Sequence, residues 1–524
     1  MTNCKFESRA VLSAKVLKGI NTLADNVAAT LGPKGRNVIL HEKGKTPFIT
    51  KDGVTVSAFV HADDEFENAA MQILKQATSQ TNTMAGDGTT TATVLAREII
   101  TKAQRYITAG ASPVELKRGI DSAVTHLVSE LKNAATHIET LDDVENIATI
   151  SANNDRTVGK LVATAVDKAG KDGSITIEES RTVETNLDVI EGFRLEAGYA
   201  ASAFVTDERR GAVHYDAPLL LVTDTKIDNV EQILPALEIV SRDGRPLIIV
   251  AEDIEGQALA ALIMNTVRGS LKIAAVKAPF YGTRRRDILS DLALSTGAEF
   301  VSRDSKIGLR DIKLQHFGQC RSIDITTVGT TVVGGKGSFE EIDSRIALLK
   351  SELQATEDIR ECTKIQERIT KLASGVAVIN VGAPTEVEMI EKKHRIEDAL
   401  EAVKSAQQEG IVPGGGVALI RAAQSLGVVS VENADQQYGV DIVADATSAP
   451  LRQMALNCGL SPDLLLSQVN DLEDNYGYDF RNDTVVNMIK SGIVDPVKVT
   501  RVALQNAASA AGTLITTSHA IVEV

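Results

Sequence analysis

The hydrophobic period of this 524-residue chain changes twice along its length. From about residue 8 to 134, and again from about 385 to 509, apolar residues recur every three or four positions, which predicts amphipathic helices, among them one at 437–458; two short strands near 37–50 interrupt the first region. Between these regions, short apolar runs at 219–223, 247–251, 273–276 and 300–302 alternate with helical stretches, which predicts a parallel sheet covered by helices. The pattern therefore indicates one helical domain built from both ends of the chain and interrupted by an α/β domain.

The expected fold class is thus multidomain, α and α/β. We expect a mainly helical domain at residues 1–136 and 410–524, an inserted α/β domain at 191–375, and a small α+β linking domain at 137–190 and 376–409. Two spacings of the capping-box type predict helix starts. They are Ser338 with Glu341, opening one charged helix to about residue 372, and Thr385 with Glu388, opening a helix to Gln408.

Composition excludes several classes of function. Asp and Glu total 70 against 55 for Lys and Arg, a formal net charge of −15, so no nucleic-acid or acidic-membrane partner is expected. No apolar run approaches the ~20 residues that span a bilayer. The first residues lack the apolar stretch of a signal peptide. The cysteines have no metal-ligand spacing, which indicates a reducing, cytoplasmic location.

The strongest local signal for chemistry is the sequence AGDGTTT at residues 85–91, directly before an amphipathic helix. Gly86 and Gly88 allow a tight turn and the close approach of a ligand. The amides of the following helical turn favour an anion, and Asp87 would supply a hard oxygen ligand to Mg²⁺ on a bound phosphate. A helix cap with a glycine-rich turn is the alternative, but three β-branched threonines are poor helix formers. The sequence therefore favours a phosphate site, although not of the Walker A type.

Two helical stretches of the middle block carry more apolar residues than one buried stripe needs. In 229–242, Leu234 and Ile239 lie off the stripe, and in 255–268 the apolar side chains spread over more than half of the circumference. The surplus indicates either deep burial or an exposed interaction surface, and the residues alone leave both open.

On these motifs the chain resembles the type I chaperonins, the GroEL family, from about Lys5 to Thr517. The resemblance implies that the helical domain is an equatorial ATP-binding domain, the linking domain an intermediate hinge domain, and the α/β domain an apical domain that binds substrate and co-chaperonin. The matching stretches keep their order and spacing, and they are Thr30–Asn37, Ile49–Val54, Ala85–Ala96, Leu116–Asp121, Thr149–Asn153, Val158–Val162, Glu386–Met389, Gly414–Arg421 and Asp495–Arg501.

The resemblance implies an ATPase that captures non-native proteins on exposed apolar apical helices and promotes their folding. It implies ATP and Mg²⁺ as cofactors, with K⁺ as a further possibility. The implied partners are unfolded or misfolded proteins, a heptameric co-chaperonin of the GroES type, and other copies of the chain in seven-membered rings, expected as two stacked rings.

The resemblance also assigns roles to individual residues. Asp52 and Asp398 would assist hydrolysis, and Asp87 would hold Mg²⁺. ATP contacts are implied for Thr30, Leu31, Gly32, Pro33, Lys51, Asp87, Gly88, Thr89, Thr90, Thr91, Gly415, Asp479, Phe480, Arg481, Ile493 and Asp495. Substrate contacts are implied for Tyr199, Phe204, Leu234, Leu237, Leu259, Ile263 and Met264.

Some residues depart from the family pattern. Phe480 and Arg481 are bulkier than the small residues common at the base site, and Ala434 and Ser461 replace acidic residues that often join the two rings. One alternative is therefore a divergent paralogue or single-ring form that binds unfolded chains without full co-chaperonin cycling. The other is a conventional ATP-dependent phosphotransferase, for which the sequence shows no acceptor pocket.

Overall fold

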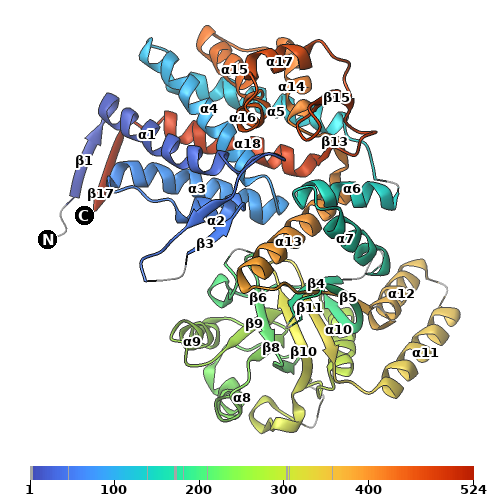
Figure 1. Ribbon diagram of the computed structural model, residues 1–524. Helices are drawn as coiled ribbons and strands as arrows, with labels where there is room; N and C mark the ends of the chain where they lie inside the picture. The colour runs from blue at the N-terminus through green and yellow to red at the C-terminus, as the bar shows by residue number, and fades with distance from the viewer. Residues whose placement is uncertain are drawn as a thin grey trace. The chain divides into compact units, whose positions relative to one another are not determined.

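The computed structural model describes residues 4–44, 47–138, 140–169, 174–180, 182–208, 210–302, 305, 307–356, 358–373 and 375–523. The chain divides into two compact units (Figure 1). Unit 1 comprises Met1–Ala163 and Ala383–Val524, and unit 2 comprises Thr164–Gly382. Both ends of the chain therefore belong to one unit, and the other is an insertion in the sequence.

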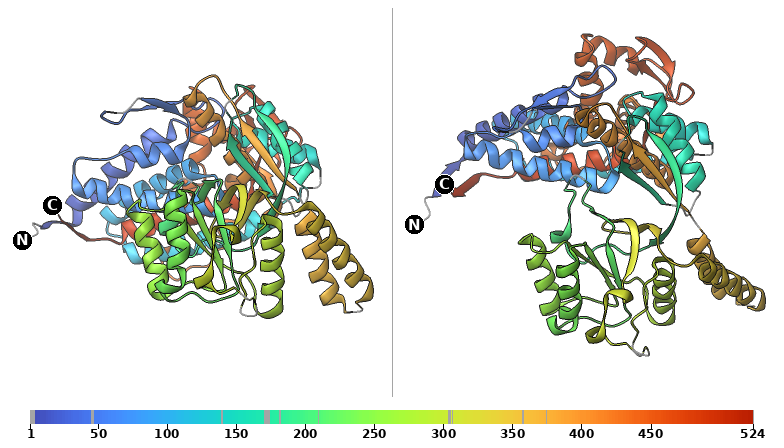
Figure 2. Two further views of the ribbon diagram at one scale, coloured as in Figure 1. Left: turned by 90° about the horizontal axis from the view of Figure 1, so that it is seen from below. Right: turned by 60° about the horizontal axis from the view of Figure 1, so that its bottom comes forward.

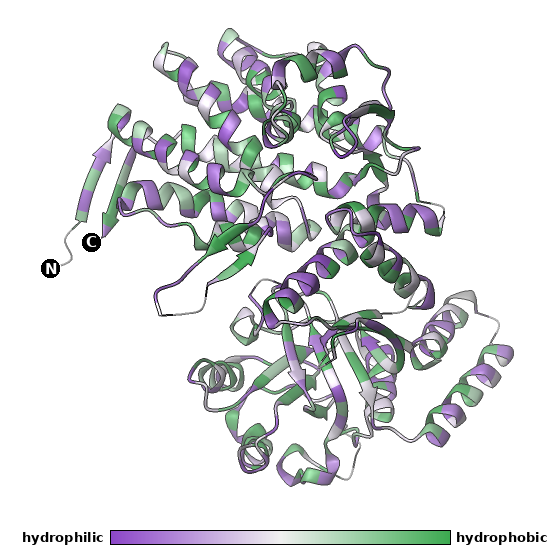
Figure 3. Cartoon of the chain, viewed as in Figure 1, coloured by the Kyte–Doolittle hydropathy of each residue, from purple (hydrophilic) through white to green (hydrophobic). Residues whose placement is uncertain are grey.

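Unit 1 is mainly helical, and its helices carry hydrophobic and hydrophilic residues side by side (Figure 3). In the described part of the chain, no helix is long and apolar enough to cross a membrane. The helices of its first half are α1 (Arg9–Ala28), α2 (Gly53–Phe59), α3 (Glu65–Ala85), α4 (Thr89–Thr108), α5 (Pro113–Asn133), α6 (Leu141–Ser151) and α7 (Arg156–Ala169), the last of which continues into unit 2. Those of its second half are α13 (Glu386–Glu409), α14 (Val417–Ala423), α15 (Ala434–Ala446), α16 (Ala449–Asn457), α17 (Pro462–Asn470) and α18 (Val497–Ile515).

Small residues let these helices approach one another closely. A Cβ on Gly119 of α5 would lie 1.9 Å from the carbonyl oxygen of Gln436, and one on Gly439 of α15 would lie 2.3 Å from that of Leu116. The buried side of α18 is likewise built largely from alanine and valine. Because only 3% of the residues are aromatic, close backbone packing fills this core where large rings would otherwise stand.

Within the described residues, four two-stranded antiparallel sheets complete unit 1. The hairpin predicted near residues 37–50 is present, and the other three sheets were not predicted, because their strands are short or join distant segments. The pairs are β1 (Cys4–Ser8) with β17 (His519–Glu523), β2 (Val38–Leu40) with β3 (Phe48–Thr50), β13 (Ile411–Pro413) with β16 (Val494–Pro496), and β14 (Tyr476–Asp479) with β15 (Thr484–Asn487).

Unit 2 is built on one mixed sheet with the strand order β4-β12-β5-β11-β10-β7-β8-β9, in which β6 also pairs with β10 (Figure 2). The strands are β4 (Ser174–Glu179), β5 (Asn186–Leu195), β6 (Val213–Asp216), β7 (Leu219–Val222), β8 (Leu247–Ala251), β9 (Ile273–Lys277), β10 (Gly318–Ile325), β11 (Thr330–Gly335) and β12 (Gly375–Val381). The helices are α8 (Val230–Asp243), α9 (Gly256–Val267), α10 (Gly282–Thr296), α11 (Phe339–Ala355) and α12 (Ile359–Ala373), with a 3₁₀ turn, η1, at Ser202–Phe204.

The predicted parallel sheet is confirmed only for β7, β8 and β9. Next to them β10 runs antiparallel to both β7 and β11. The strand predicted at 300–302 is wrong, since in the described residues this segment makes only an isolated bridge between Val301 and Thr223. A segment this short has too few residues for its apolar character to distinguish a strand from a buried loop.

Two long helices predicted from the sequence are each divided. The charged stretch after residue 338 forms α11 and α12, and the stretch at 437–458 forms α15 and α16, because Pro450 suits the first turn of a new helix. Among the described residues the Ser338 side chain makes no cap hydrogen bond, so that capping box is wrong. Thr385 does accept from the backbone nitrogen of Glu388, at 3.3 Å.

A buried ion cluster joins three helices of unit 2. Asp291 on α10 is 1% exposed, and its carboxylate accepts from Arg368 Nε at 2.7 Å and Arg368 Nη2 at 2.9 Å. Arg345 on α11 adds a third contact at 3.3 Å. Such a pair tolerates the loss of both charges better than the loss of one, because a single buried charge stays uncompensated.

We therefore expect Asp291→Leu to destabilise unit 2 by about 3–5 kcal/mol. The double variant Asp291→Leu with Arg368→Met should recover most of that loss, since neither member of the buried pair is left alone and Arg345, with 29% of its side chain exposed, stays solvated. Urea unfolding and limited proteolysis of the α11–α12 region check this. A double variant as unstable as Asp291→Leu would contradict the ion-pair explanation.

Candidate active site

Every residue that the sequence assigned to nucleotide binding or hydrolysis lines one cavity of about 290 Å³ in unit 1. The lining comes from separate parts of the chain: the first strands and helices, the C-terminal end of α6, one face of α13, and segments at 415–419, at 450–454, around β14 and around β16. The fold therefore brings together side chains that lie hundreds of positions apart in the sequence.

The loop between α3 and α4 forms one wall. Gly86 ends α3 with φ 75° and Gly88 begins α4 with φ 90°, both in the left-handed region that favours glycine. Asp87 lies between them, and its carboxylate accepts from the Gly88 amide at 2.6 Å and from Ser151 Oγ at 3.1 Å. The turn thus places a carboxylate directly beside the start of α4.

The start of α4 fits an anion. The first amides of a helix have no partner inside it, and the N-cap Gly88 has no side chain to supply one. Thr89 is 5% exposed, and its hydroxyl oxygen has no hydrogen-bond partner within the described residues. A buried hydroxyl left unpaired is costly, and a phosphate oxygen at this position would satisfy it together with the amides.

A second wall is formed by residues 30–33 and 51–52, and Thr30 Oγ1 lies 3.5 Å from Thr90 Oγ1 at the start of α4. Lys51 donates to the carbonyl oxygen of Gly32 at 3.0 Å, and burial lowers the pKa of its amine. Asp52 caps α2 by accepting from the amides of Val54 at 3.1 Å and Thr55 at 3.0 Å. Both charged side chains are therefore fixed by the backbone around them and are pre-positioned at the cavity.

Two acidic groups, Asp87 and Asp495, lie close together in the cavity. Burial, and then the charge of Asp87, raise the pKa of the Asp495 carboxyl to about 7. In the described residues no group of three or more His, Cys, Asp or Glu is placed to hold a metal ion. Mg²⁺ commonly takes only one or two carboxylates and completes its shell with phosphate and water, so Asp87 fits a magnesium that arrives with a phosphate.

Helix α13 closes the cavity with Asp398. Its residues Glu391, His394, Arg395, Asp398 and Ala402 share one helical face and line the space. Asp398 thus shares a cavity with Asp52 and Asp87.

Close packing holds α13 in place. Ser405 Oγ donates to the carbonyl oxygen of Ala85 at 2.8 Å. A Cβ on Gly86 would lie only 2.0 Å from Cβ of Glu401. The loop and the helix are therefore packed backbone to backbone, with no room for a larger side chain at position 86.

Phe480 and Arg481, which are bulkier than the family pattern, line the end of the cavity where the resemblance implies the nucleotide base. Phe480 is 3% exposed and packs in an apolar cluster that includes Met454 and Met488, with its ring edge-on to Tyr478 at 5.3 Å. The Asp479 carboxylate accepts from the amide of Arg481 at 2.8 Å. Much of the extra volume is thus buried in the core beside the cavity.

Sequence reasoning missed several lining residues. Asn153 and Asn154 follow α6 with φ 57° and 63°, a conformation that asparagine tolerates better than most residues, and both face the cavity. His394 and Arg395 were also missed, and Arg395 pairs with Asp155 at 3.0 Å. The Asn-Asn dipeptide after a helix was the available signal for the first pair.

In unit 2 the residues assigned to substrate contact are divided between surface and core. Leu234 and Met264 are each 47% exposed. The expected exposure is wrong for Phe204, which is 0% exposed, and for Leu237, which is 7% exposed. Leu237 lies on the buried stripe of α8, and Phe204 belongs to the core of the sheet. The other three, Tyr199, Leu259 and Ile263, are partly buried against that core.

Fold and cavity together define a chaperonin. Residues 23–524 match the model of the TCP-1/cpn60 chaperonin family, and the chain belongs to that family. Its structure is similar to that of the chaperonin gp146 from the bacteriophage EL 2 (Pseudomonas aeruginosa), crystallised in the presence of ATP-BeFx. For crystal form II the TM-score is 0.65 with 19% sequence identity, and for crystal form I it is 0.62 with 19%. Each comparison covers 99% of both chains, and at this identity the likeness shows the fold.

The raised pKa of Asp495 predicts a stability change with pH. Because its pKa is about 7 in the folded chain against 3.8 as the ordinary value, ionisation costs the folded state progressively more as pH rises between these values. Without nucleotide and Mg²⁺, Asp495→Asn should stabilise unit 1 by up to about 4 kcal/mol at about pH 8, and by less than half of that at about pH 5.

Urea unfolding at the two pH values checks this, with the exposed Asp474→Asn as the control. The same gain at both pH values, or a loss of stability at the higher one, would show that folding does not raise the pKa of the Asp495 carboxyl.

Proposed function

We propose that this chain is an ATP-driven chaperonin of the type I class, which hydrolyses ATP in the cavity of unit 1 and uses nucleotide binding to control the capture of non-native proteins by unit 2. The observation that carries the proposal is the convergence of the 85–91 loop, Asp52 and Asp398 on one cavity. Membership of the chaperonin family supports it, as does the ATP analogue present with the structurally similar gp146.

In this proposal the phosphates lie at the start of α4, where the amides and hydroxyls of Thr89, Thr90 and Thr91 bind their oxygens, and Lys51 adds a positive charge. Asp87 would hold the Mg²⁺, which supplies charge neutralisation at the phosphates. Asp479, Ile493 and Asp495 would line the base and ribose.

Asp52 and Asp398 are the groups proposed to act on the attacking water. Both are carboxylates that line the same cavity as the start of α4, and a carboxylate can accept hydrogen bonds from a water molecule and orient it. Asp398 stands on α13, whereas Asp52 caps α2. Hydrolysis then depends on α13 remaining docked, which couples the chemical step to the position of one helix.

The proposed client surface consists of the exposed apolar residues of α8 and α9. Leu234, Met264 and Val267, which is 69% exposed, are its most accessible members. Each contributes at most roughly 1.5–3 kcal/mol on burial, so one subunit would bind a client weakly. A ring of seven copies would bind the same client at several points and gain avidity. Two stacked rings and a heptameric co-chaperonin of the GroES type complete the proposal.

The function is tested with Asp398→Ala. We expect it to keep ATP binding and to lower steady-state phosphate release by about 10²-fold or more, because a group that orients or deprotonates water typically contributes that much. Gln407→Ala, an exposed substitution on the same helix, is the matched control and should leave turnover unchanged.

Unchanged turnover in Asp398→Ala would overturn the proposed role of α13. Transfer of the phosphoryl group to an acceptor other than water would favour a phosphotransferase. Equal capture of a denatured protein with and without ATP would contradict the chaperonin cycle.

A further inference from the structure

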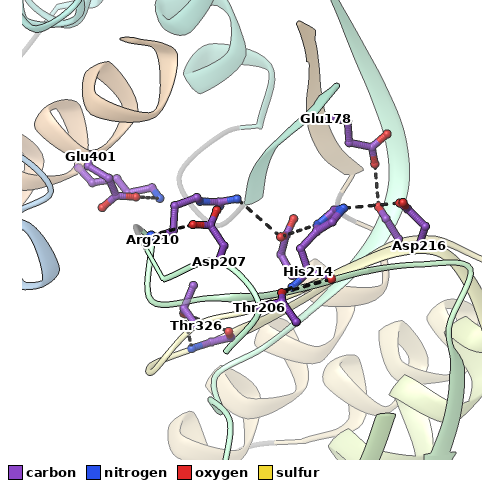
Figure 4. A network of polar contacts seen from close by, with 12 residues as sticks. Glu178, Thr206, Asp207, Arg210, His214, Asp216, Thr326 and Glu401 are labelled. Atoms are coloured by element: carbon purple, nitrogen blue, oxygen red, sulfur yellow. Dashed lines mark hydrogen bonds and ion pairs between the residues drawn. The ribbon is translucent and has the colours of Figure 1, made fainter. Parts of the chain in front are cut away.

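A buried ion pair links two neighbouring strands in unit 2. β6 runs antiparallel to the second half of β10, and His214 lies directly opposite Asp324. Asp324 is 5% exposed, and its Oδ1 lies 2.9 Å from His214 Nδ1. Figure 4 shows the imidazole of His214 beside Asp216, whose Oδ1 lies 3.5 Å from Nε2.

The carboxylate of Asp324 depends strongly on this histidine. Its other charged neighbour is Arg210, whose Nη1 lies 3.8 Å from Oδ1. Oδ2 is buried and has no hydrogen-bond partner among the described residues. A buried charge that loses its closest partner is strongly destabilised, so neutral His214 would leave Asp324 poorly compensated.

The other polar groups around the pair come from β11 and β5, on the side of β10 away from β6. Thr331 on β11 lies opposite Asp324, and Arg194 on β5 lies opposite Thr331, so both share the face of the sheet that carries the pair. These groups flank the pair without an ion pair to either member among the described residues.

Further along β10 the charges are already paired. Glu178 on β4 accepts from Ser322 Oγ at 2.7 Å and from Arg321 Nη2 at 2.6 Å. In the turn before β6, the Asp207 carboxylate accepts from the amide of Arg210 at 3.2 Å. Asp216, with 84% of its side chain exposed, is well solvated and adds little to the pair.

His214 is also hydrogen-bonded to the turn that follows Phe204. Its backbone nitrogen donates to Thr206 Oγ1 at 2.9 Å, two residues after Phe204. Phe204 ends η1 and is 0% exposed in the core of the sheet. Backbone bonds between Asp207 and Ala212 join the turn after Phe204 to the residue before β6, so loss of the pair would loosen β6 and this turn together.

We infer that His214 and Asp324 form a latch that holds β6 and η1 against the sheet. While His214 is protonated, the latch keeps Phe204 buried. When His214 is neutral, the latch opens and Phe204 becomes accessible. The latch itself rests on unit 2 alone. Its consequence for client binding rests on the proposed function and on the substrate contact that the family resemblance implies for Phe204.

The direction of the pH dependence follows from the chemistry of the pair. The hydrogen bond to Asp324 raises the pKa of His214 above its ordinary value of 6.5, although burial opposes it. A group whose pKa is raised on folding contributes its full stability below the unfolded pKa and loses it as pH rises through the folded pKa. The latch therefore opens toward alkaline pH, not toward acid.

Hydrogen exchange of the full-length, nucleotide-free protein, corrected for the intrinsic exchange rate, tests the latch. Between about pH 6.5 and about pH 8.5, protection of the amides of Phe204 and β6 should fall by about tenfold or more, because the buried carboxylate loses its partner. His214→Gln should show the low protection at both pH values. Asp216→Asn on the same strand is the matched control and should behave like the original protein.

Protection that does not change with pH, or that is equal in His214→Gln and the original protein at the lower pH, would overturn the latch. The titration of the original protein decides this even if the variant does not fold. Capture of a denatured client is measured in parallel. Capture that stays constant while protection falls would support the latch and contradict the role of Phe204 in client binding.

Discussion

The close packing of α13 on the loop between α3 and α4 is the constraint on which the rest of the site depends. The absence of a side chain at Gly86 lets the helix approach that loop, and the bond from Ser405 to Ala85 fixes its height along it. A helix held at that height places Asp398 beside Asp52 and Asp87. In the proposed function, the same contact therefore decides whether the cavity can only bind phosphate or can also hydrolyse ATP.

Apolar residues have different roles in the two units. In unit 1, alanine, valine and glycine let helices pack at short distance around α18, which makes a rigid frame for the loops of the cavity. In unit 2, the sheet is covered on both faces along β7 to β9, yet α8 and α9 keep apolar residues at the surface. Exposed apolar area costs solubility, so it is expected where a partner is to be bound.

Much of unit 1 was predictable, because its long helices carry a regular period and the 85–91 loop combines glycines, a carboxylate and a helix start. The pairing of β1 with β17 was not, since each strand has five residues and they lie at opposite ends of the chain. The burial of Phe204 was also not predictable, because it depends on where the 3₁₀ turn η1 packs. Leu237 lies on the apolar stripe of α8, and only the family resemblance implied that it is exposed.

The pairing of His214 with Asp324 shows a further limit of sequence reasoning. The two residues are 110 positions apart and meet only through the register of β6 on β10. Asp398 shows a related limit: periodicity predicted its helix, whereas only the family resemblance implied its place at the nucleotide site. Both placements depend on how distant segments pack against each other, which the periodicity of a single sequence does not reveal.

Hydrogen exchange of α13 and of the loop at residues 85–91, with and without Mg·ATP, tests the central claim most directly. If nucleotide, loop and helix form one site, Mg·ATP should slow exchange in the loop and along the cavity-facing turns of α13 together. Slower exchange in the loop with unchanged exchange in α13 would contradict the account, because the helix that carries Asp398 would then not belong to the nucleotide site.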